Sequence, residues 1–273
     1  MRNVYRTFIG SFPAILSIIF CCSIVVSGNR IVLFGDEEAV NATYIPLDSP
    51  RGIRMLESSH TQRSLFYSNS LHFVTQINQG YCGIASAVMT LNGVVPKTRA
   101  PVDPVYRPYK YFTQSEWVKE PCVKTKMSRS PFMGLTLEQE ASLLSCVKEI
   151  DTSTVYADSD LSAEEMSKMI KNALDNDAHV IANILRTAIG EVGYGHFSPI
   201  SAYHELSYFG KVKTYFLFMD VARYKYGPVW VEGNVLVKAM RQIDTGSERP
   251  RGFLIVTPGR PKFDKSNRYV QSE

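Results

Sequence analysis

Cys82 is the residue of this sequence best placed to act as a nucleophile, because it stands in the run Tyr81-Cys82-Gly83 directly ahead of a helical pattern. At the first turn of a helix, unpartnered backbone N–H groups and the positive end of the helix dipole stabilise a thiolate over a thiol. Gln76, six residues upstream, lies within reach of the same point and can donate to a developing oxyanion. The alternative is a buried packing cysteine, since Cys is among the most buried residue types.

A nucleophilic cysteine requires a base nearby and a third group that orients the base. His196 is the strongest candidate among the five histidines, because the glycines before it, such as Gly195, permit close approach of backbone or ligand. The segment that follows His196 is typical of a strand, which would hold the imidazole rigidly. His204 is the alternative base, since a residue eight positions later on an unbroken strand points to the same face.

Asp220 is the candidate for the orienting group. It ends the apolar run 215–219, where a carboxylate is costly to bury unless it is paired. One partner is the Nδ1–H of His196, which would fix the tautomer that turns Nε2 toward sulfur. The other is Arg223, three residues later. A Cys followed far downstream by His and Asp is the chain order of papain-like thiol enzymes, so the sequence indicates acyl transfer.

The composition is that of a globular protein. Of the 273 residues, 45% are hydrophobic and 21% charged, and the formal net charge is +4. We find no dense basic stripe with interleaved aromatic residues and therefore expect no nucleic-acid partner. The sequence has no internal repeat, Gly-rich phosphate loop or zinc-ligand spacing, so we expect no structural metal site.

The five cysteines do not form the pattern of a disulfide framework. Cys21 and Cys22 lie in the apolar N-terminal stretch, which leaves three cysteines for the folded body. An odd number at wide spacing suits one free reactive thiol. A bridge between Cys122 and Cys146 in an oxidising compartment is compatible with this pattern.

The N-terminal segment predicts export from the cytoplasm. Arg2 and Arg6 precede an apolar run over about 8–26, which is typical of a secretory signal. The run is also long enough for an uncleaved membrane signal-anchor, and a buried helix is the third alternative. We expect residues 1–30 to be this segment and the protein to be periplasmic or otherwise extracytoplasmic, either free or membrane-anchored through residues about 8–27. Residues 31–60 are expected to be a leader or linker.

Helical patterns precede strand patterns in the body of the chain. A helix is expected after Cys82, and two capping boxes begin at Thr136 and Ser162, the first followed by an apolar face that extends to Ile150. The stretch 96–131 has little periodicity. Strands are predicted over 179–185, 200–206, 215–221 and 253–256, and one more helix over 231–243. This order predicts an α+β fold in which the helical part, with the nucleophile helix, packs on an antiparallel sheet.

Five blocks of the sequence together are similar to the phytochelatin synthase family. They are Gln76, Tyr81–Ser86, Gly195–Ile200, Asp220–Tyr226 and Arg251–Phe253, and the resemblance extends over about residues 76–258. It implies a papain-like catalytic domain over 61–260, followed by a flexible tail over 261–273. It also implies a Cys82–His196–Asp220 triad with Gln76 as the oxyanion donor.

The resemblance implies a substrate pocket as well. The family's substrate-binding acid and arginine correspond to Asp244 and Arg251, which suit the ammonium and carboxylate of a γ-glutamyl group. Arg223, Tyr226 and Gly195 are expected to line the same pocket. The alternative is an ordinary surface salt bridge between Asp244 and Arg251.

The implied reaction is attack of the thiol on the Cys–Gly amide of glutathione, followed by transfer of the γ-glutamylcysteinyl group to a second glutathione or to water. Only about fifteen residues follow Pro258, as in short single-domain members, for which we expect more hydrolysis and less polymer synthesis. We expect an insertion at Ser207–Thr214 to lengthen a hairpin tip. Cys122 and Cys146 stand where the family often has additional cysteines.

We expect no bound cofactor. Cd(II), Zn(II) or Cu(I) would enter as glutathione–thiolate complexes, because sulfur is a soft ligand. The membrane would be contacted only through the N-terminal segment, and a homodimer is left open. Two other functions remain: a papain-like thiol peptidase or glutathione hydrolase, and a non-catalytic binder of metal–thiolate complexes.

Overall fold

The computed structural model of the chain describes residues 25–26, 31–32, 43–127, 134–158 and 160–259. The chain divides into two units, Met1–Asn41 and Ala42–Glu273. Within the first, β1 (Val25–Val26) and β2 (Ile31–Val32) pair antiparallel. The rest of the predicted signal segment and the predicted tail at 261–273 lie outside the described residues. Among the described residues, no helix combines the length and apolar character needed to cross a bilayer.

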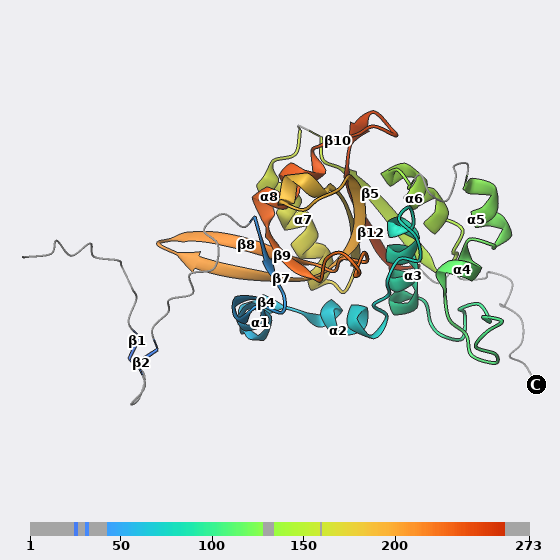
Figure 1. Ribbon diagram of the computed structural model, residues 1–273, viewed down its shortest axis with the longest axis horizontal. Helices are drawn as coiled ribbons and strands as arrows, with labels where there is room; N and C mark the ends of the chain where they lie inside the picture. Colours follow the sequence, from blue (N-terminus) through green and yellow to red (C-terminus); the bar gives the residue numbers. More distant parts are fainter. Residues whose placement is uncertain (1–24, 27–30, 33–42, 128–133, 159, 260–273) are drawn as a thin grey trace, which may run out of the picture. The chain divides into compact units, whose positions relative to one another are not determined.

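An eight-stranded antiparallel sheet forms the centre of the second unit (Figure 1). Each of its pairings is antiparallel, so the predicted α+β class with an antiparallel sheet is confirmed. In spatial order the strands are β3 (Tyr44–Pro46), β9 (Val229–Glu232), β8 (Lys211–Phe218), β7 (Gly195–Tyr208), β6 (His179–Leu185), β12 (Gly252–Pro258) and β5 (Ile150–Tyr156), while β4 (Thr61–Gln62) pairs with β7.

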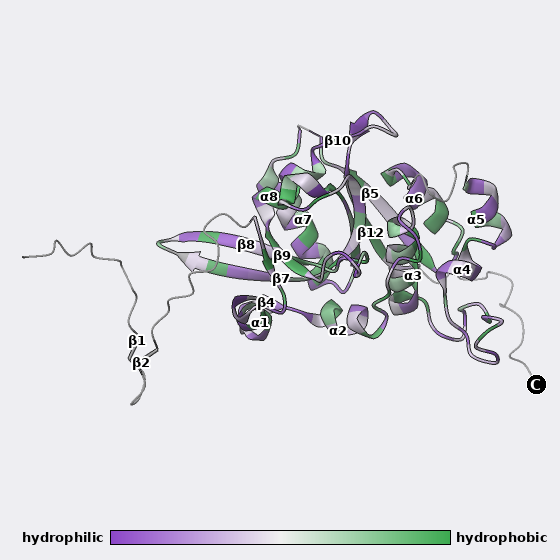
Figure 2. Ribbon diagram, viewed as in Figure 1, coloured by the Kyte–Doolittle hydropathy of each residue, from purple (hydrophilic) through white to green (hydrophobic). Residues whose placement is uncertain are grey.

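Helices cover both faces of this sheet. The strands alternate between two hydrophobic clusters, so that Ile181 of β6 packs with α3 (Cys82–Val94) while Val180 packs with α7 (Ala163–Asp175) and α8 (Gly233–Met240). Figure 2 shows hydrophobic residues along the inner strands, with more hydrophilic ones on the β7–β8 hairpin. The helix that begins at Cys82 therefore packs on the sheet, as predicted.

The two capping boxes are present at the predicted positions. Thr136 and Ser162 each accept a hydrogen bond from the third residue of the helix that follows, α6 (Leu137–Leu144) and α7. The first helix is shorter than predicted, because Ile150 begins β5 and pairs with β12. A single buried apolar residue such as Ile150 fits the hydrophobic pattern of a helix and that of a strand equally well. Here its pairing with β12 makes it part of a strand.

Residues 31–60 are not wholly a linker, in contrast to the prediction. Tyr44–Pro46 pairs with β9 as β3, and α1 (Pro50–Glu57) follows it. The indole Nε1 of Trp230 in β9 donates a hydrogen bond to the Gly52 carbonyl oxygen at 3.1 Å. The second unit therefore begins near residue 42, before the predicted boundary at 61. The helix α2 (Ser64–Leu71) precedes the loop to Cys82.

The stretch 96–131 contains two short helices, α4 (Gln114–Trp117) and α5 (Pro121–Lys126). A disulfide joins Cys122 of α5 to Cys146, just after α6. The pairing that the sequence left open is therefore present. Cys82 is the free cysteine among the described residues.

Two hairpins carry residues predicted for the site, His196 on the first and Asp244 on the second. The long β7–β8 hairpin projects from the body of the sheet with its turn at Phe209 and Gly210, within the predicted insertion (Figure 1). A bulge between Ile200 and Ala202 interrupts the regular register of β7. The short hairpin of β10 (Ile243–Asp244) and β11 (Arg249–Pro250) leads into β12.

Candidate active site

The sulfur of Cys82 is buried at the start of α3. The residue is 6% exposed, and the backbone N–H groups of Phe197 and Gly83 lie close enough to its side chain to lower its pKa. Burial raises the pKa of Cys82 to about 11; the Phe197 N–H lowers it, Glu140 raises it, and the Gly83 N–H lowers it. The expectation that the helix terminus favours a thiolate is therefore wrong for this structure, because loss of hydration outweighs the helix N–H groups.

His196 is the residue before Phe197 in β7. The strand whose backbone lies close to the Cys82 sulfur therefore also carries the predicted base. Its Nε2 is 2.9 Å from Oδ1 of Asp220 and 3.0 Å from Oγ of Ser198. A carboxylate can only accept, so Nε2 carries the hydrogen and Nδ1 is left with the lone pair. The predicted tautomer, with Nδ1–H on Asp220, is therefore wrong. Burial lowers the pKa of His196 despite the hydrogen bond that its Nε2–H donates to Asp220, so the imidazole is neutral near pH 7.

Asp220 is fully buried two residues after the end of β8 and accepts hydrogen bonds from several sides. Nη1 and Nη2 of Arg186 lie 2.6 Å and 3.0 Å from its two oxygens, and the Ala222 N–H donates at 2.7 Å. Burial alone would raise the pKa of Asp220, but His196 and Arg186 lower it to about 2. Asp220 thus pairs with His196 as predicted, and with Arg186 instead of Arg223.

Arg186 was missed by the sequence reasoning, although a signal for it exists. It begins the 3₁₀ turn η1 (Arg186–Ile189) directly after β6, and Asp220 lies two residues after the apolar end of β8. Arg186 also pairs with Glu191, and burial raises the pKa of Glu191 to about 7. A charged residue of each sign after the apolar end of a separate strand could therefore have been recognised as a candidate buried ion pair.

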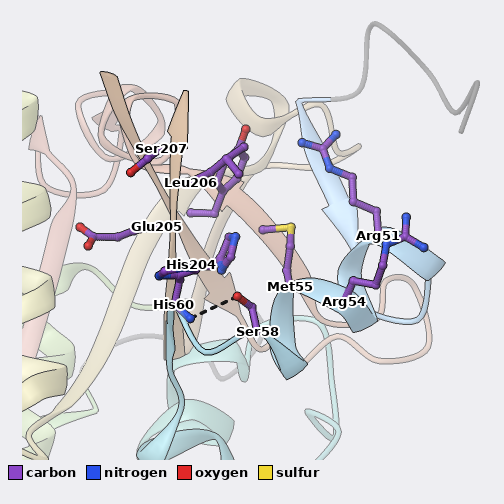
Figure 3. Close-up of a pocket in the computed structure, with 10 residues that line it drawn as sticks. Arg51, Arg54, Met55, Ser58, His60, His204, Glu205, Leu206 and Ser207 are labelled. Atoms are coloured by element: carbon purple, nitrogen blue, oxygen red, sulfur yellow. Dashed lines mark hydrogen bonds between the residues drawn. The ribbon is translucent and has the colours of Figure 1, made fainter. Parts of the chain in front are cut away.

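His204, the alternative base, lies away from this cluster. The bulge in β7 shifts its alternation, so the ring of His204 packs against Trp230, whereas the ring of His196 packs against Phe218. Its Nδ1 is 2.8 Å from Oγ1 of Thr61, which itself donates to the Met55 carbonyl oxygen, so Nδ1 carries the hydrogen. His204 lines a separate cavity (Figure 3), whose volume is about 440 Å³. This cavity is lined by Arg51, Arg54, Met55, Ser58, His60, His204, Glu205, Leu206, Ser207 and Tyr215.

Arg251 lies against the backbone beside His196. Its Nη1 is 3.0 Å from Oδ1 of Asn183 and 3.3 Å from Oδ2 of Asp244. A Cβ on Gly195 would overlap the guanidinium, so only glycine permits this approach. Burial lowers the pKa of Arg251, whereas Asp244 and the Cys82 thiolate raise it. The pair is thus buried, unlike an ordinary surface salt bridge, and lies within electrostatic range of the sulfur.

Gln76 is buried in the loop between α2 and α3. Its backbone N–H donates to the Val221 carbonyl oxygen at 2.9 Å, next to Asp220. One hydrogen of Nε2 donates to the Asn78 carbonyl oxygen at 2.7 Å. The second hydrogen of the amide nitrogen remains for another acceptor.

Comparison with known families is decisive, since the family model described as phytochelatin synthase matches residues 36–253. This chain belongs to the phytochelatin synthase family. It is 30% identical over 213 residues to glutathione γ-glutamylcysteinyltransferase 1 of Lotus japonicus, an alignment that covers 76% of this chain and 38% of the relative. The enzyme of that name from Schizosaccharomyces pombe is 28% identical over 197 residues, covering 71% and 43%. The chain spans about two fifths of the length of these relatives.

In this member of the phytochelatin synthase family, the two remaining predicted pocket residues lie farther out. Arg223 is exposed, with its guanidinium 4.6 Å from the ring centre of Phe73. The Tyr226 hydroxyl accepts a hydrogen bond from the Val192 N–H at 2.7 Å, and its ring lies 5.2 Å from the guanidinium carbon of Arg186. Within the ranges that the structure describes, no three metal-ligating side chains come together.

Proposed function

We propose that this chain is a glutathione γ-glutamylcysteinyltransferase with a papain-like catalytic domain. The observation that carries the proposal is the buried pair of His196, on β7, with Asp220, together with the closeness of the Cys82 side chain to the backbone N–H of Phe197, the residue after His196. The names of the relatives support the substrate and the reaction. The antiparallel sheet with the helix of Cys82 packed on it supports the papain-like assignment.

The first step begins from a neutral thiol and a neutral imidazole, because burial opposes charge on both. Nδ1 of His196 takes the proton as the sulfur of Cys82 attacks the carbonyl carbon of the Cys–Gly amide. Asp220 stabilises the resulting imidazolium, because it is ionised and accepts the Nε2–H. The second N–H of Gln76 donates to the oxyanion of the tetrahedral intermediate.

The C–N bond then breaks, and His196 returns the proton to the departing amino group of glycine. A γ-glutamylcysteinyl thioester remains on Cys82. In the second step, the amino group of another glutathione, or a water molecule, attacks the thioester carbonyl while His196 accepts its proton. The bond to sulfur breaks and the thiol is restored.

Asp244 and Arg251 are proposed to hold the γ-glutamyl group. Its ammonium suits the carboxylate of Asp244, and its carboxylate suits the guanidinium of Arg251. Burial of both side chains near Cys82 supports this role. Gly195 makes room for Arg251, and we place Arg223 and Tyr226 at the outer wall, where an acceptor glutathione or its complex with Cd(II), Zn(II) or Cu(I) would enter.

The test is to incubate the full chain with glutathione, with and without Cd(II), and to resolve the products by mass. We expect release of glycine, together with γ-Glu-Cys or longer (γ-Glu-Cys) chains. Cys82→Ser and His196→Ala should abolish release, whereas His60→Ala, a change of an exposed histidine, should not. Absence of glycine release from the unaltered chain in both conditions would refute the proposal.

The hydrolase alternative differs only in the acceptor, and the same product analysis separates it. A general thiol peptidase would instead cleave α-linked peptides. The buried Asp244–Arg251 pair favours a γ-glutamyl substrate over these peptides. Turnover of α-linked peptides at rates equal to that of glutathione would favour the peptidase.

We also propose that the protein is exported. The basic and apolar N-terminal segment supports this, and so does the Cys122–Cys146 disulfide, because disulfides persist mainly in oxidising compartments. The mass of the mature protein isolated from its cell envelope would show whether residues 1–30 are removed. Recovery of the full-length chain from the cytoplasm alone would contradict export.

A further inference from the structure

Glu140 is a fully buried acid that the proposed mechanism does not use. It lies on α6 with none of its surface exposed, whereas Glu138 on the same helix is exposed. Neither carboxyl oxygen has a hydrogen-bond partner among the described residues. Buried polar side chains nearly always have one, and an unpaired buried charge is costly. Such an arrangement calls for an explanation.

The carboxyl group of Glu140 reaches the first turn of α3. A Cβ on Gly83 would overlap Oε2 of Glu140 and would lie 3.1 Å from Cδ1 of Leu135. Only glycine at this position therefore leaves room for the acid. Because Gly83 directly follows Cys82, Glu140 lies beside the N–H groups that begin the helix of the nucleophile.

Glu140 acts on the sulfur through its charge. Its carboxylate raises the pKa of Cys82, and the groups that oppose it are the N–H groups of Phe197 and Gly83 and the guanidinium of Arg186. Burial raises the pKa of Glu140 itself to about 8. The acid is therefore neutral near pH 7 and becomes negative in the mildly alkaline range, where a thiol would otherwise begin to ionise.

We propose that Glu140 is a positioning residue that controls the ionisation of Cys82 through the first turn of α3. This role in catalysis rests on the proposed function of Cys82 as the nucleophile. While Glu140 is protonated, the helix terminus and Arg186 act on the sulfur without opposition from a neighbouring anion. Once Glu140 ionises, two negative charges would have to share one unhydrated site, and the thiolate is disfavoured.

The test measures thiolate formation directly and does not depend on catalysis. The full chain, Glu140→Gln, Glu140→Met and the matched control Glu138→Gln are treated with iodoacetamide between about pH 6 and pH 10. Labelling of the peptide that contains Cys82 is then followed by mass. We expect both Glu140 variants to react about tenfold faster than the unaltered chain at pH 9–10, which corresponds to one pKa unit, and at the same rate below about pH 7. Glu138→Gln should match the unaltered chain throughout.

Equal rates for the Glu140 variants and the unaltered chain at every pH would overturn the proposal, as would an equal acceleration by Glu138→Gln. The unaltered chain gives a second measurement that needs no variant. Its labelling rate should rise less steeply with pH above about 8, where Glu140 ionises. Glycine release from glutathione is recorded in parallel. If the Glu140 variants change the labelling rate of Cys82 but the unaltered chain releases no glycine, the effect of Glu140 on Cys82 stands and only the proposed function is refuted.

Discussion

Replacing Asp220 by Asn should destabilise the fold in a way that depends on pH. The pKa of Asp220 is about 2, compared with an ordinary value of 3.8. Each unit of difference between the folded and unfolded states is equivalent to about 1.4 kcal/mol, so the ionised carboxylate stabilises the fold by about 2 kcal/mol at pH 7. Asn also leaves Arg186 with a buried charge that only Glu191 balances, which adds to the loss.

The pH window follows from the direction of this shift. A carboxylate whose pKa is lowered by folding contributes its full stabilisation above the unfolded pKa of about 4 and loses it as the pH falls toward 2. Urea unfolding, followed by tryptophan fluorescence, should therefore show Asp220→Asn to be less stable by about 2 kcal/mol or more at pH 7. The difference from the unaltered chain should shrink between about pH 4 and pH 2. Asp160→Asn, at an exposed position, serves as the matched control.

Two results would refute this reasoning. One is equal stability of Asp220→Asn and the unaltered chain at pH 7, and the other is a difference that stays constant down to pH 2. Glycine release gives an independent reading, because Asn can turn its amide N–H toward Nε2 and reverse the tautomer of His196. Loss of an orienting acid of this kind lowers kcat by roughly 10²–10⁴-fold.

Three further outcomes are expected. Replacing both cysteines of the α5–α6 disulfide by alanine should cost about 3 kcal/mol of unfolding free energy in urea, because the bridge closes a loop with a sequence separation of 24; an unchanged midpoint would contradict this. Gly195→Ala should displace Arg251 and raise KM for glutathione roughly 10- to 100-fold, whereas Gly227→Ala, where the added methyl meets open space, should leave KM unchanged. The acid limb of kcat/KM should lie below pH 6.5, since the base must be neutral and burial lowers the pKa of His196; a limb above that value would count against it.

His196 and Asp220 come together as predicted, and Cys82 lies near the backbone of Phe197, the residue after His196. Each of the three residues has a local signal in the sequence. Cys82 begins a helical pattern, His196 follows glycine, and Asp220 follows the apolar end of a strand. Which nitrogen of His196 meets Asp220 depends on the side-chain rotamer, and no sequence spacing determines it. The bulge in β7 between His196 and His204 is likewise a single extra residue, and no residue type in the sequence predicts it.

Residues whose partners lie far along the chain were not predicted. Arg186 meets Asp220 across 34 residues, and Glu140 meets Gly83 across two helices, so neither contact has a local pattern. The same limit explains β3, since Tyr44–Pro46 becomes a strand only by pairing with β9. A predicted strand such as His179–Leu185 is mostly apolar and is buried over almost its whole length, because both faces of the sheet are covered.

The bond between Cys122 and Cys146 is a second group on this protein that can react with the proposed substrate, glutathione. Cys122 is exposed on α5, and a thiolate can open a disulfide by attacking one of its sulfurs to form a mixed disulfide. The proposed substrate is a thiol, so it would also act as a reductant of the disulfide that links α5 to the end of α6, the helix of Glu140. A soft metal ion bound to the sulfur of glutathione would slow this exchange, because the thiolate is then not free to attack.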